Sequence, residues 1–576
     1  MKKLLRFLES YRKEAVLAPL FKLFEVILEL IVPLVIAHLV DVGIPSGDRG
    51  LIGKLCILLI ALALTGLISA VTAQYFAARA ATGFAADVRS ALFSHIQSFS
   101  WPQLDQAGTS KLITRLTSDI NTLQNGVNLA LRLLLRSPFV AVGACVMAFT
   151  IDPKSARILA IDVPILLLII FAILLGTLPL YKRIQSHLDR VTLSTRETIT
   201  GVRVLRAFRR EQDEIERFES ENSLLTSLQC FTGRISALLN PATYLFINAG
   251  ILILVYTGAL RVNTGTLTTG QLIALYNYMS QVLVELIKLA NLVITLTRAA
   301  ASGDRVESIL EMPVGEQRIS DPSVLKDAPK VSFENVSFRY PGAAGNAVEN
   351  ISFSVRAGQT FGIIGGTGSG KSTLVHLIPG FYKPQSGFIR IDGADIRSMD
   401  TDALRARVGL VPQKPTLFSG TIESNLRFGN ESASEDKMWQ ALRCAQAESF
   451  VREKEKMLQE PVLEGGANFS GGQKQRLTIA RALVREPEIL ILDDSSSALD
   501  FATDAQLRAA IRALPWHPTV FIVSQRTSSI QGCDMILVLD NGLPAGLGRH
   551  EELLESCPLY REIHASQNRK ENGYEA

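Results

Sequence analysis

Residues 358–377 read GQTFGIIGGTGSGKSTLVHL, and this stretch decides the fold of the second half of the chain. It contains a complete G-x-x-x-x-G-K-[ST] pattern between an apolar, β-prone run and a helix-prone segment. Glycines let backbone N–H groups surround phosphates, and a helix N-terminus favours the same negative charge. In this context the pattern predicts an ATP site in an α/β domain, the alternative being a chance glycine-rich turn. The predicted binding residues are Gly365, Gly366, Thr367, Gly368, Ser369, Gly370, Lys371, Ser372 and Thr373.

The acidic end of a later strand completes a predicted metal site. Lys371 is expected to reach the outer phosphates of the nucleotide, and the Ser372 hydroxyl to ligate Mg²⁺. Residues 488–494, EILILDD, form an apolar run that ends in two aspartates. Asp493 is therefore the second predicted Mg²⁺ ligand, directly or through water. The stretch between the two motifs leaves room for an inserted helical subdomain.

A second glycine-rich turn lies at residues 468–473, NFSGGQ, ahead of another helix-prone segment. Ser470, Gly471, Gly472 and Gln473 open that segment, and a helix N-terminus of this kind is also an anion site. One domain has little use for two phosphate clamps on one nucleotide. We therefore expect this turn to bind a nucleotide that is held by another subunit.

The first half of the chain has the composition of a membrane protein. Mean hydropathy is positive although a fifth of the 576 residues is charged, which indicates two unlike halves. Six segments have the roughly 20 apolar residues needed to cross a bilayer core of about 30 Å. An even number of spans places both termini on one side, and the basic N-terminus makes that side cytoplasmic by the positive-inside rule. The spans are predicted at Val16–Ile44, Leu51–Ala77, Ala130–Ile151, Arg157–Tyr181, Ile235–Leu260 and Leu272–Leu296.

The connections between these spans fall into two length classes. Those on the outer side are a few residues long, whereas the inner ones, residues 78–129 and 182–234, each exceed fifty residues and remain helix-prone. The spanning helices are therefore expected to extend into the cytosol. Residues 100–121 and 196–218 combine charge with apolar spacing. They suit helices that pack on a partner domain, although solvated charged helices have the same pattern.

Ionisable residues inside the spans are costly and are therefore candidates for function. Two oppositely charged pairs stand three residues apart, so each pair shares a helix face and can form an ion pair. Pairing and lining of a polar translocation cavity both stay open, and the acidic residue of the fourth span is expected near the outer interface. The residues concerned are Lys22, Glu25 and Glu29 in the first span, Asp162 in the fourth, and Glu285 and Lys288 in the sixth.

Composition argues against several other classes of protein. A net charge of +4 with dispersed basic residues does not favour a nucleic-acid partner. The six cysteines show no metal-ligand spacing and fit a reducing compartment. The N-terminus lacks a short apolar core followed by a small-residue cleavage site, so the first apolar span is expected to stay as an anchor.

In the content and order of its motifs the chain resembles the ABC transporters, and nearly all of it is similar to an exporter half-transporter. The resemblance rests on the P-loop, FSGGQ, the Walker B strand and SALD at residues 497–500. It implies a transmembrane domain at residues 1–312, a linker at 313–328 and a nucleotide-binding domain at 329–576. The implied fold class is an all-α six-helix transmembrane domain followed by an α/β P-loop ABC ATPase domain with a helical subdomain.

The resemblance also implies roles for single residues. Tyr340 resembles the aromatic residue that stacks on adenine, and Gln413 the glutamine that contacts Mg²⁺ or the attacking water. Asp500 resembles the aspartate of the dimer interface. The glycine-rich turn at residues 468–473 resembles the family's signature motif and is called the signature turn below. Phe469 replaces its usual leucine, which is a mild change. Residues 463–468, LEGGAN, depart further from the usual acidic lead-in to that turn.

Two positions of the hydrolytic machinery depart from the family pattern. Asp494 stands where a catalytic glutamate is expected, and Gln525 where a switch histidine is expected. Asp494 keeps the charge but is one methylene shorter, and a displacement of about 1 Å can cost on the order of 10²-fold in rate. Gln525 can donate a hydrogen bond to phosphate but cannot relay a proton. ATP binding is expected to survive, whereas hydrolysis at this chain's own Walker motifs is expected to be impaired.

This asymmetry resembles that of heterodimeric bacterial multidrug exporters, in which one site is degenerate. The chain is therefore expected to pair with a second half-transporter in a bacterial plasma membrane and to complete that partner's active site. The expected cofactors are ATP and Mg²⁺, and the expected cargo is an amphipathic drug, lipid or peptide. Two alternatives stay open: a homodimeric exporter with slow turnover, and an ATP-gated regulatory membrane protein that does not pump.

Overall fold

The computed structural model describes residues 3–313 and 328–571, apart from the side chains of Leu174 and of residues 568–571. Most of the predicted linker, residues 313–328, lies outside this description. The chain divides into two compact units, which are described in turn.

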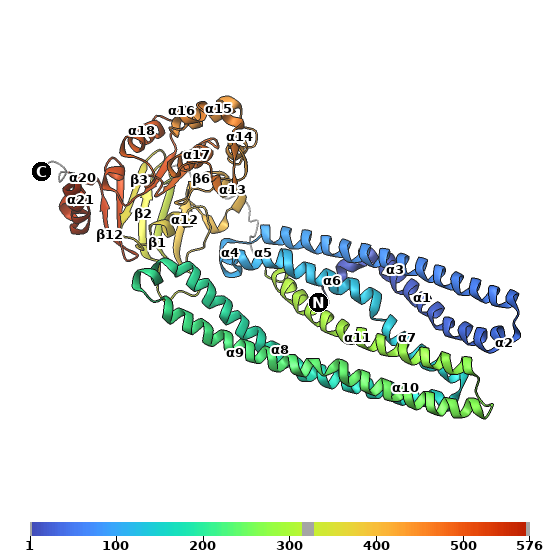
Figure 1. Ribbon diagram of the computed structural model, residues 1–576. Helices are drawn as coiled ribbons and strands as arrows, with labels where there is room; N and C mark the ends of the chain where they lie inside the picture. Colours follow the sequence, from blue (N-terminus) through green and yellow to red (C-terminus); the bar gives the residue numbers. More distant parts are fainter. Residues whose placement is uncertain (1–2, 314–327, 572–576) are drawn as a thin grey trace. The chain divides into compact units, whose positions relative to one another are not determined.

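The first unit, residues 1–98 and 107–313, is built from six helical segments that are long and apolar enough to cross a membrane (Figure 1). This confirms the predicted all-α six-helix domain. The segments are 42 to 56 residues long, so each continues beyond the roughly 20 residues that a bilayer core requires. Their main helices are α1 (Arg12–His38), α3 (Arg49–Gln97), α6 (Ile120–Leu133) with α7 (Arg136–Ile151), α8 (Pro153–Phe208), α9 (Glu211–Ala237) with α10 (Leu239–Asn263), and α11 (Thr269–Leu310). Shorter elements are η1 (Leu4–Tyr11), η2 (Leu39–Gly43), α2 (Ile44–Ser46), α5 (Thr109–Thr114) and η3 (Arg115–Asp119).

The short turns that precede α3, α8 and α11 each end in a residue that caps the helix. At the start of α3, Asp48 accepts a hydrogen bond at 2.7 Å from the backbone N–H two residues later. At the start of α8, Asp152 accepts one at 2.8 Å from the N–H three residues later. Thr268 and Gln271 form a reciprocal capping box at the start of α11. Because these caps satisfy N–H groups that the helix leaves unpaired, the turns can stay only a few residues long.

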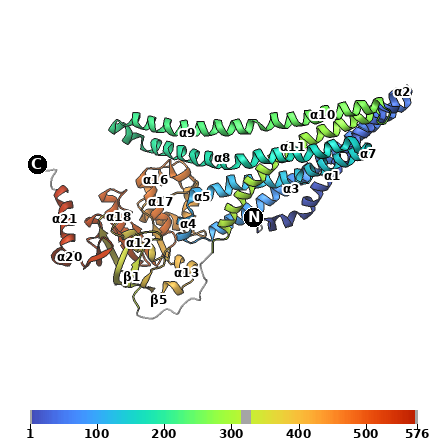
Figure 2. The same cartoon turned by 90° about the horizontal axis from the view of Figure 1, so that it is seen from below.

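Close helix packing buries one acidic residue of the membrane unit. Helix α8 lies alongside α9 and α10, as Figure 2 shows. Asp162 of α8, which was expected near the outer interface, is only 8% exposed within the helix bundle, and its depth in the membrane stays a prediction. A Cβ added to Gly250 of α10 would lie 3.0 Å from Asp162 Oδ2. The same Cβ would lie still closer to Met279 Cε, so a glycine at this point of α10 makes room for Met279 as well as for the carboxylate.

The second unit contains a mostly parallel sheet of strand order β12-β11-β3-β10-β9-β6, in which only β12 is antiparallel to its neighbour. Every residue of β9 and β10 is buried, as fits strands that are covered on both faces. A second, antiparallel sheet has the order β2-β1-β4-β5, and β7 pairs with β8. These sheets confirm the predicted α/β ATPase domain.

The bounds of its strands are β1 (Val331–Phe338), β2 (Val348–Val355), β3 (Thr360–Gly365), β4 (Ser386–Ile391), β5 (Ala394–Asp395), β6 (Val408–Val411), β7 (Gly420–Thr421), β8 (Pro461–Val462), β9 (Ile489–Asp493), β10 (Thr519–Val523), β11 (Met535–Asp540) and β12 (Leu543–Gly548). Its helices are α12 (Lys371–Leu377), α13 (Thr401–Ala406), α14 (Ile422–Arg427), α15 (Glu435–Cys444), α16 (Glu448–Arg452), α17 (Gly471–Leu483), α18 (Phe501–Arg512), α19 (Thr527–Ile530), α20 (His550–Ser556) and α21 (Pro558–Glu571). Helices α14 to α17 lie in the insertion between β6 and β9, where the sequence predicted a helical subdomain.

Residues 99–106, from the first long connection, group with the second unit. The last six of these residues form most of helix α4 (Trp101–Ala107). The Trp101 ring stacks on Phe381 with centroids 4.4 Å apart, and the Tyr382 hydroxyl donates a hydrogen bond to Asp105 at 2.6 Å. For this segment the contacts favour packing on an ATPase domain over a merely solvated helix.

Candidate nucleotide-binding site

Most of the predicted nucleotide residues lie in loops that leave one edge of the parallel sheet. Strands β3, β10, β9 and β6 are adjacent and parallel, so their carboxyl ends meet at that edge. The P-loop follows β3, Gln525 follows β10, Asp494 follows β9, and Gln413 follows β6. Strand order therefore brings together residues that are far apart in the sequence.

A cavity of about 320 Å³ lies at this edge of the sheet. Its size is at the lower end of the range of about 300–1,000 Å³ that is usual for small-molecule sites. Most of the P-loop contributes to its wall, together with residues at the ends of β6, β9 and β10 and from the connection between β1 and β2. The lining residues are Tyr340, Ala347, Thr367, Gly368, Ser369, Gly370, Lys371, Ser372, Thr373, Gln413, Asp494, Val523 and Gln525.

Lys371 and Ser372 of the P-loop both have defined hydrogen-bond partners. Lys371 Nζ donates to the backbone oxygens of Gly365 at 2.9 Å and Gly366 at 2.6 Å. Burial lowers the pKa of Lys371, an effect that the neighbouring carboxylates oppose. Ser372 Oγ donates to Asp493 Oδ1 at 2.8 Å. A hydroxyl and a carboxylate side by side are hard oxygen ligands, so these two residues fit a Mg²⁺ ion that is also held by phosphate oxygens and water.

Asp494 occupies a constrained position beside the cavity. Its φ of +46° lies in the left-handed region, which aspartate tolerates better than most non-glycine residues. Gln413 Nε2 donates to Asp494 Oδ2 at 3.3 Å, so these two predicted catalytic residues are in contact. Burial raises the pKa of Asp494, the hydrogen bond from Gln413 opposes this, and the charge of Asp493 raises it further. The carboxylate is thus held toward Gln413 and is more basic than an exposed aspartate.

Tyr340 is the predicted adenine contact. Its ring lies edge-on to Phe338 with centroids 4.9 Å apart, and its hydroxyl lies 3.1 Å from Thr373 Oγ1. These contacts fix the ring at the border of the cavity, where a base can stack on it.

The signature turn does not line this cavity. Ser470 instead caps α17, where it forms a capping box with Gln473, and Ser470 Oγ accepts from the Gln473 N–H at 3.3 Å. Asp500 caps α18 by accepting from the Thr503 N–H at 2.7 Å, and this bond lowers the pKa of Asp500. Within the described part of this unit, the signature turn therefore lies outside the cavity that the P-loop lines.

His376 is a site neighbour that the sequence reasoning missed. Its Nε2 lies 3.4 Å from Asp493 Oδ2. The signal was present, because His376 follows Ser372 by four residues and shares its face of α12.

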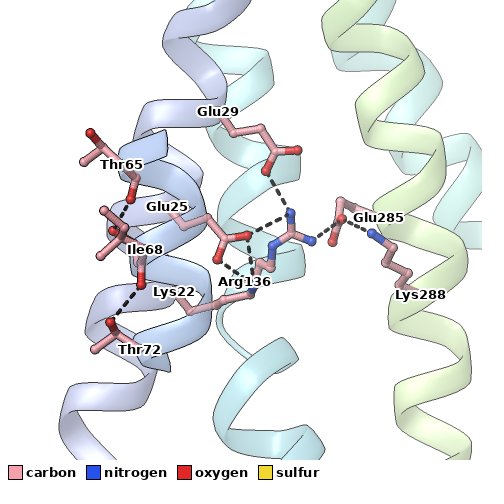
Figure 3. Close-up of polar contacts among 10 residues, drawn as sticks. Lys22, Glu25, Glu29, Thr65, Ile68, Thr72, Arg136, Glu285 and Lys288 are labelled. Carbon is pink, nitrogen blue, oxygen red and sulfur yellow. Dashed lines mark hydrogen bonds and ion pairs between the residues drawn. The ribbon is translucent and has the colours of Figure 1, made fainter. Parts of the chain in front are cut away.

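In the first unit, the ionisable residues singled out in the first and sixth spans form ion pairs (Figure 3). Lys288 Nζ lies 2.8 Å from Glu285 Oε1, as their spacing indicated. Arg136 of α7, which the sequence reasoning did not single out, lies 2.6 Å from Glu285 and 2.8 Å from Glu29. Arg136 therefore joins helices α1, α7 and α11.

The same network extends along α1. Lys22 Nζ lies 2.6 Å from Glu25 Oε2, and Glu25 is within 4.0 Å of Arg136. Three cations thus face three carboxylates, a balance that supports pairing over an open polar cavity. We call this set the charge network; it consists of Lys22, Glu25, Glu29, Arg136, Glu285 and Lys288.

A six-helix membrane unit and an α/β unit with a P-loop cavity together define a membrane-spanning P-loop ATPase. The family model of the ABC transporter transmembrane region matches residues 16–286, and that of the ABC transporter ATPase matches residues 348–497. The chain belongs to the ABC transporter family, as a half-transporter with one transmembrane region fused to one ATPase domain.

Several known proteins are similar over most of the chain. An uncharacterized ABC transporter ATP-binding protein of Mycobacterium tuberculosis is 37% identical over 97% of each chain. A probable multidrug resistance ABC transporter ATP-binding/permease protein of Bacillus subtilis is 33% identical over 83% of this chain and 82% of its own. The structure of a bacterial Atm1-family ABC exporter with ATP bound matches with a TM-score of 0.79 and 25% identity, covering 96% of this chain and 98% of that one. The fold is thus that of an Atm1-like exporter.

Proposed function

We propose that this chain is one half of an ATP-driven exporter that moves amphipathic drugs, lipids or peptides out of a bacterial cell. Both termini and the ATPase domain lie in the cytoplasm. The other half is a different half-transporter whose catalytic acid is complete. The resemblance to a probable multidrug resistance transporter supports an amphipathic cargo.

The main support for a heterodimer is a mismatch within one ATPase domain, between its nucleotide-binding residues and its hydrolytic positions. The P-loop, Ser372 and Asp493 form a coherent nucleotide and metal site. Asp494 and Gln525, at the two hydrolytic positions, line the same cavity. The signature turn keeps its full FSGGQ sequence but lies away from that cavity. A partner with a complete catalytic acid would use this turn, whereas a homodimer would contain two impaired sites.

The residues of this chain hold nucleotide more readily than they hydrolyse it. Bound Mg²⁺ would neutralise charge on the phosphates, with Ser372 and Asp493 as its protein ligands. Asp494 is drawn toward Gln413 and is too short to orient water well for in-line attack. Gln525 can donate to the γ-phosphate but cannot carry a proton away. ATP therefore stays bound here while the partner-centred site turns over.

The turn between α8 and α9 supports a role in coupling. Phe208 at this turn is 74% exposed. An exposed aromatic side chain at the end of two long helices suits a contact with the partner's ATPase domain.

Co-expression with a candidate second half-transporter, sought first in the neighbouring gene, tests the proposal. The chain alone is expected to show little ATP turnover, and the pair is expected to be active. Replacing the catalytic glutamate of the partner by glutamine should abolish most of that turnover. Ser470→Ala in this chain should lower it by about 10²-fold, because it removes a phosphate contact of the partner's site.

Ser556→Ala, at an exposed serine of α20, serves as the matched control and should leave turnover unchanged. Strong turnover by the single chain that is lost on Asp494→Asn would contradict the degenerate site. It would favour the homodimer instead. Uphill accumulation of a fluorescent cargo in vesicles, dependent on hydrolysable ATP, separates a pump from an ATP-gated protein.

A further inference from the structure

The last helix of the chain holds the loop that carries Gln525. Gln567 of α21 donates its Nε2 to the Gln525 backbone oxygen at 2.7 Å. Its Oε1 accepts from the Thr527 backbone N–H at 2.8 Å and from the Thr527 hydroxyl at 3.0 Å. One side-chain amide thus fixes the backbone on both sides of Arg526.

A histidine on the same helix strengthens this contact. His564 Nδ1 lies 3.1 Å from Thr527 Oγ1. Because the Thr527 hydroxyl donates its hydrogen to Gln567, its oxygen is the acceptor and His564 Nδ1 is the donor. Thr527 is only 2% exposed, so water does not readily replace either partner.

Helix α21 is itself firmly seated on the ATPase domain. Tyr560 is fully buried, and its hydroxyl lies 2.7 Å from His550 Nδ1. Leu559 and Ile563 pack against the same apolar core. A helix anchored in this way can serve as a fixed support for a neighbouring loop.

Other contacts hold the two ends of this loop and one side chain in it. The Ser524 N–H donates to the Ile363 backbone oxygen at 3.1 Å, and Arg508 donates to the Ser528 and Ser529 backbone oxygens at 3.0 and 3.3 Å. The Arg526 guanidinium lies over the Phe501 ring, 4.9 Å from its centroid.

Gln525 is exposed at the cavity, next to the end of β10. Among residues 328–571, the hydrogen bonds that reach the backbone of Gln525, Arg526 and Thr527 from outside the segment 524–531 all come from Gln567. Between the two anchored ends, α21 therefore supplies the hydrogen bonds that hold the backbone at Gln525 and Thr527.

We propose that Gln567 is a positioning residue for the γ-phosphate contact of Gln525. It acts through the backbone of the loop and does not touch the nucleotide. The proposal rests on the proposed role of Gln525 as the residue that meets the γ-phosphate. It makes the discrimination of ATP from ADP at this site depend on a helix more than thirty residues farther along the chain.

Competition photolabelling tests this proposal on the full-length transporter. Labelling by 8-azido-ATP is read on the band of this chain, with Mg·ATP or Mg·ADP as competitor. Gln567→Ala is expected to weaken ATP about threefold to tenfold, the worth of one or two hydrogen bonds, and to leave ADP unchanged. Gln567→Glu should have at least the same effect, because it places an oxygen against the Gln525 carbonyl. Ser566→Ala, at an exposed neighbouring residue, is the matched control and should change neither affinity.

A double-mutant cycle with Gln525→Ala separates positioning from a general structural role. Once the Gln525 side chain is gone, Gln567→Ala should cause no further loss of ATP affinity. Equal loss of ATP and ADP binding, or additive losses in the double variant, would overturn the proposal. If Gln525→Ala weakens ATP selectively but Gln567→Ala does not, positioning by α21 is wrong while the nucleotide site stands. If Gln525→Ala has no effect, the γ-phosphate role falls and positioning falls with it.

Discussion

An Asp494→Glu, Gln525→His double variant is expected to raise ATP turnover at this chain's own Walker site by at least about 10²-fold. The added methylene carries the carboxylate past its contact with Gln413 and farther into the cavity, where the attacking water lies. Histidine restores a group that can donate to the γ-phosphate and also exchange a proton. The measurement is phosphate release by the proposed heterodimer after the catalytic glutamate of the proposed partner has been changed to glutamine, so that only this site is read.

The single variants divide this effect between the two positions. Asp494→Glu alone should give most of the gain, because it places the base. That gain works against a backbone φ of +46°, which glutamate tolerates less well than aspartate. Ser372→Ala in the double variant should remove the gain, since it takes away a proposed Mg²⁺ ligand. Wild-type turnover that already equals that of the double variant would show that the site is not impaired.

The P-loop was visible in the sequence because its residues are contiguous, and residues 367–373 of it line one cavity in the structure. The P-loop is one stretch whose glycines and lysine have a local reason to be there. The contact of Gln413 with Asp494 is different, because it depends on β6 lying next to β9, and strand order is not visible in a local pattern. The contact of Gln567 with the Gln525 loop is harder still to predict. It exists only because α21 packs on the domain beside that loop.

In the membrane unit, the spacing rules found pairs within a helix but missed partners between helices. Lys288 and Glu285 were visible as an i, i+3 pair. Arg136 stood near the start of an apolar segment, where arginine is ordinarily taken as an interfacial residue. The burial of Asp162 was not visible for a similar reason: its position along α8 does not show its packing beside Gly250 of α10. Burial of a charge depends on helix rotation, which a single sequence does not provide.

Arg136→Ala is expected to destabilise the membrane unit by about 3–5 kcal/mol, the cost of leaving buried carboxylates without their cation. The Arg136 side chain is 9% exposed and that of Glu285 is 5% exposed, so water cannot readily take over. The measurement is thermal unfolding of the purified transporter in detergent. A fall in melting temperature of at least about 6 °C is expected, at roughly 2 °C per kcal/mol for a unit of this size.

Arg210→Ala is the matched control. Arg210 pairs with Asp213 on the surface, and their side chains are 69% and 61% exposed. Such exposed pairs contribute about 0–1 kcal/mol, so this variant should shift the melting temperature little. Replacing both Arg136 and Glu285 by leucine should restore part of the loss, because the buried cation and its most buried carboxylate are then removed together. Equal shifts for Arg136→Ala and Arg210→Ala would mean that water reaches the charge network, and the network would then be part of a hydrated translocation path rather than a structural link between α1, α7 and α11.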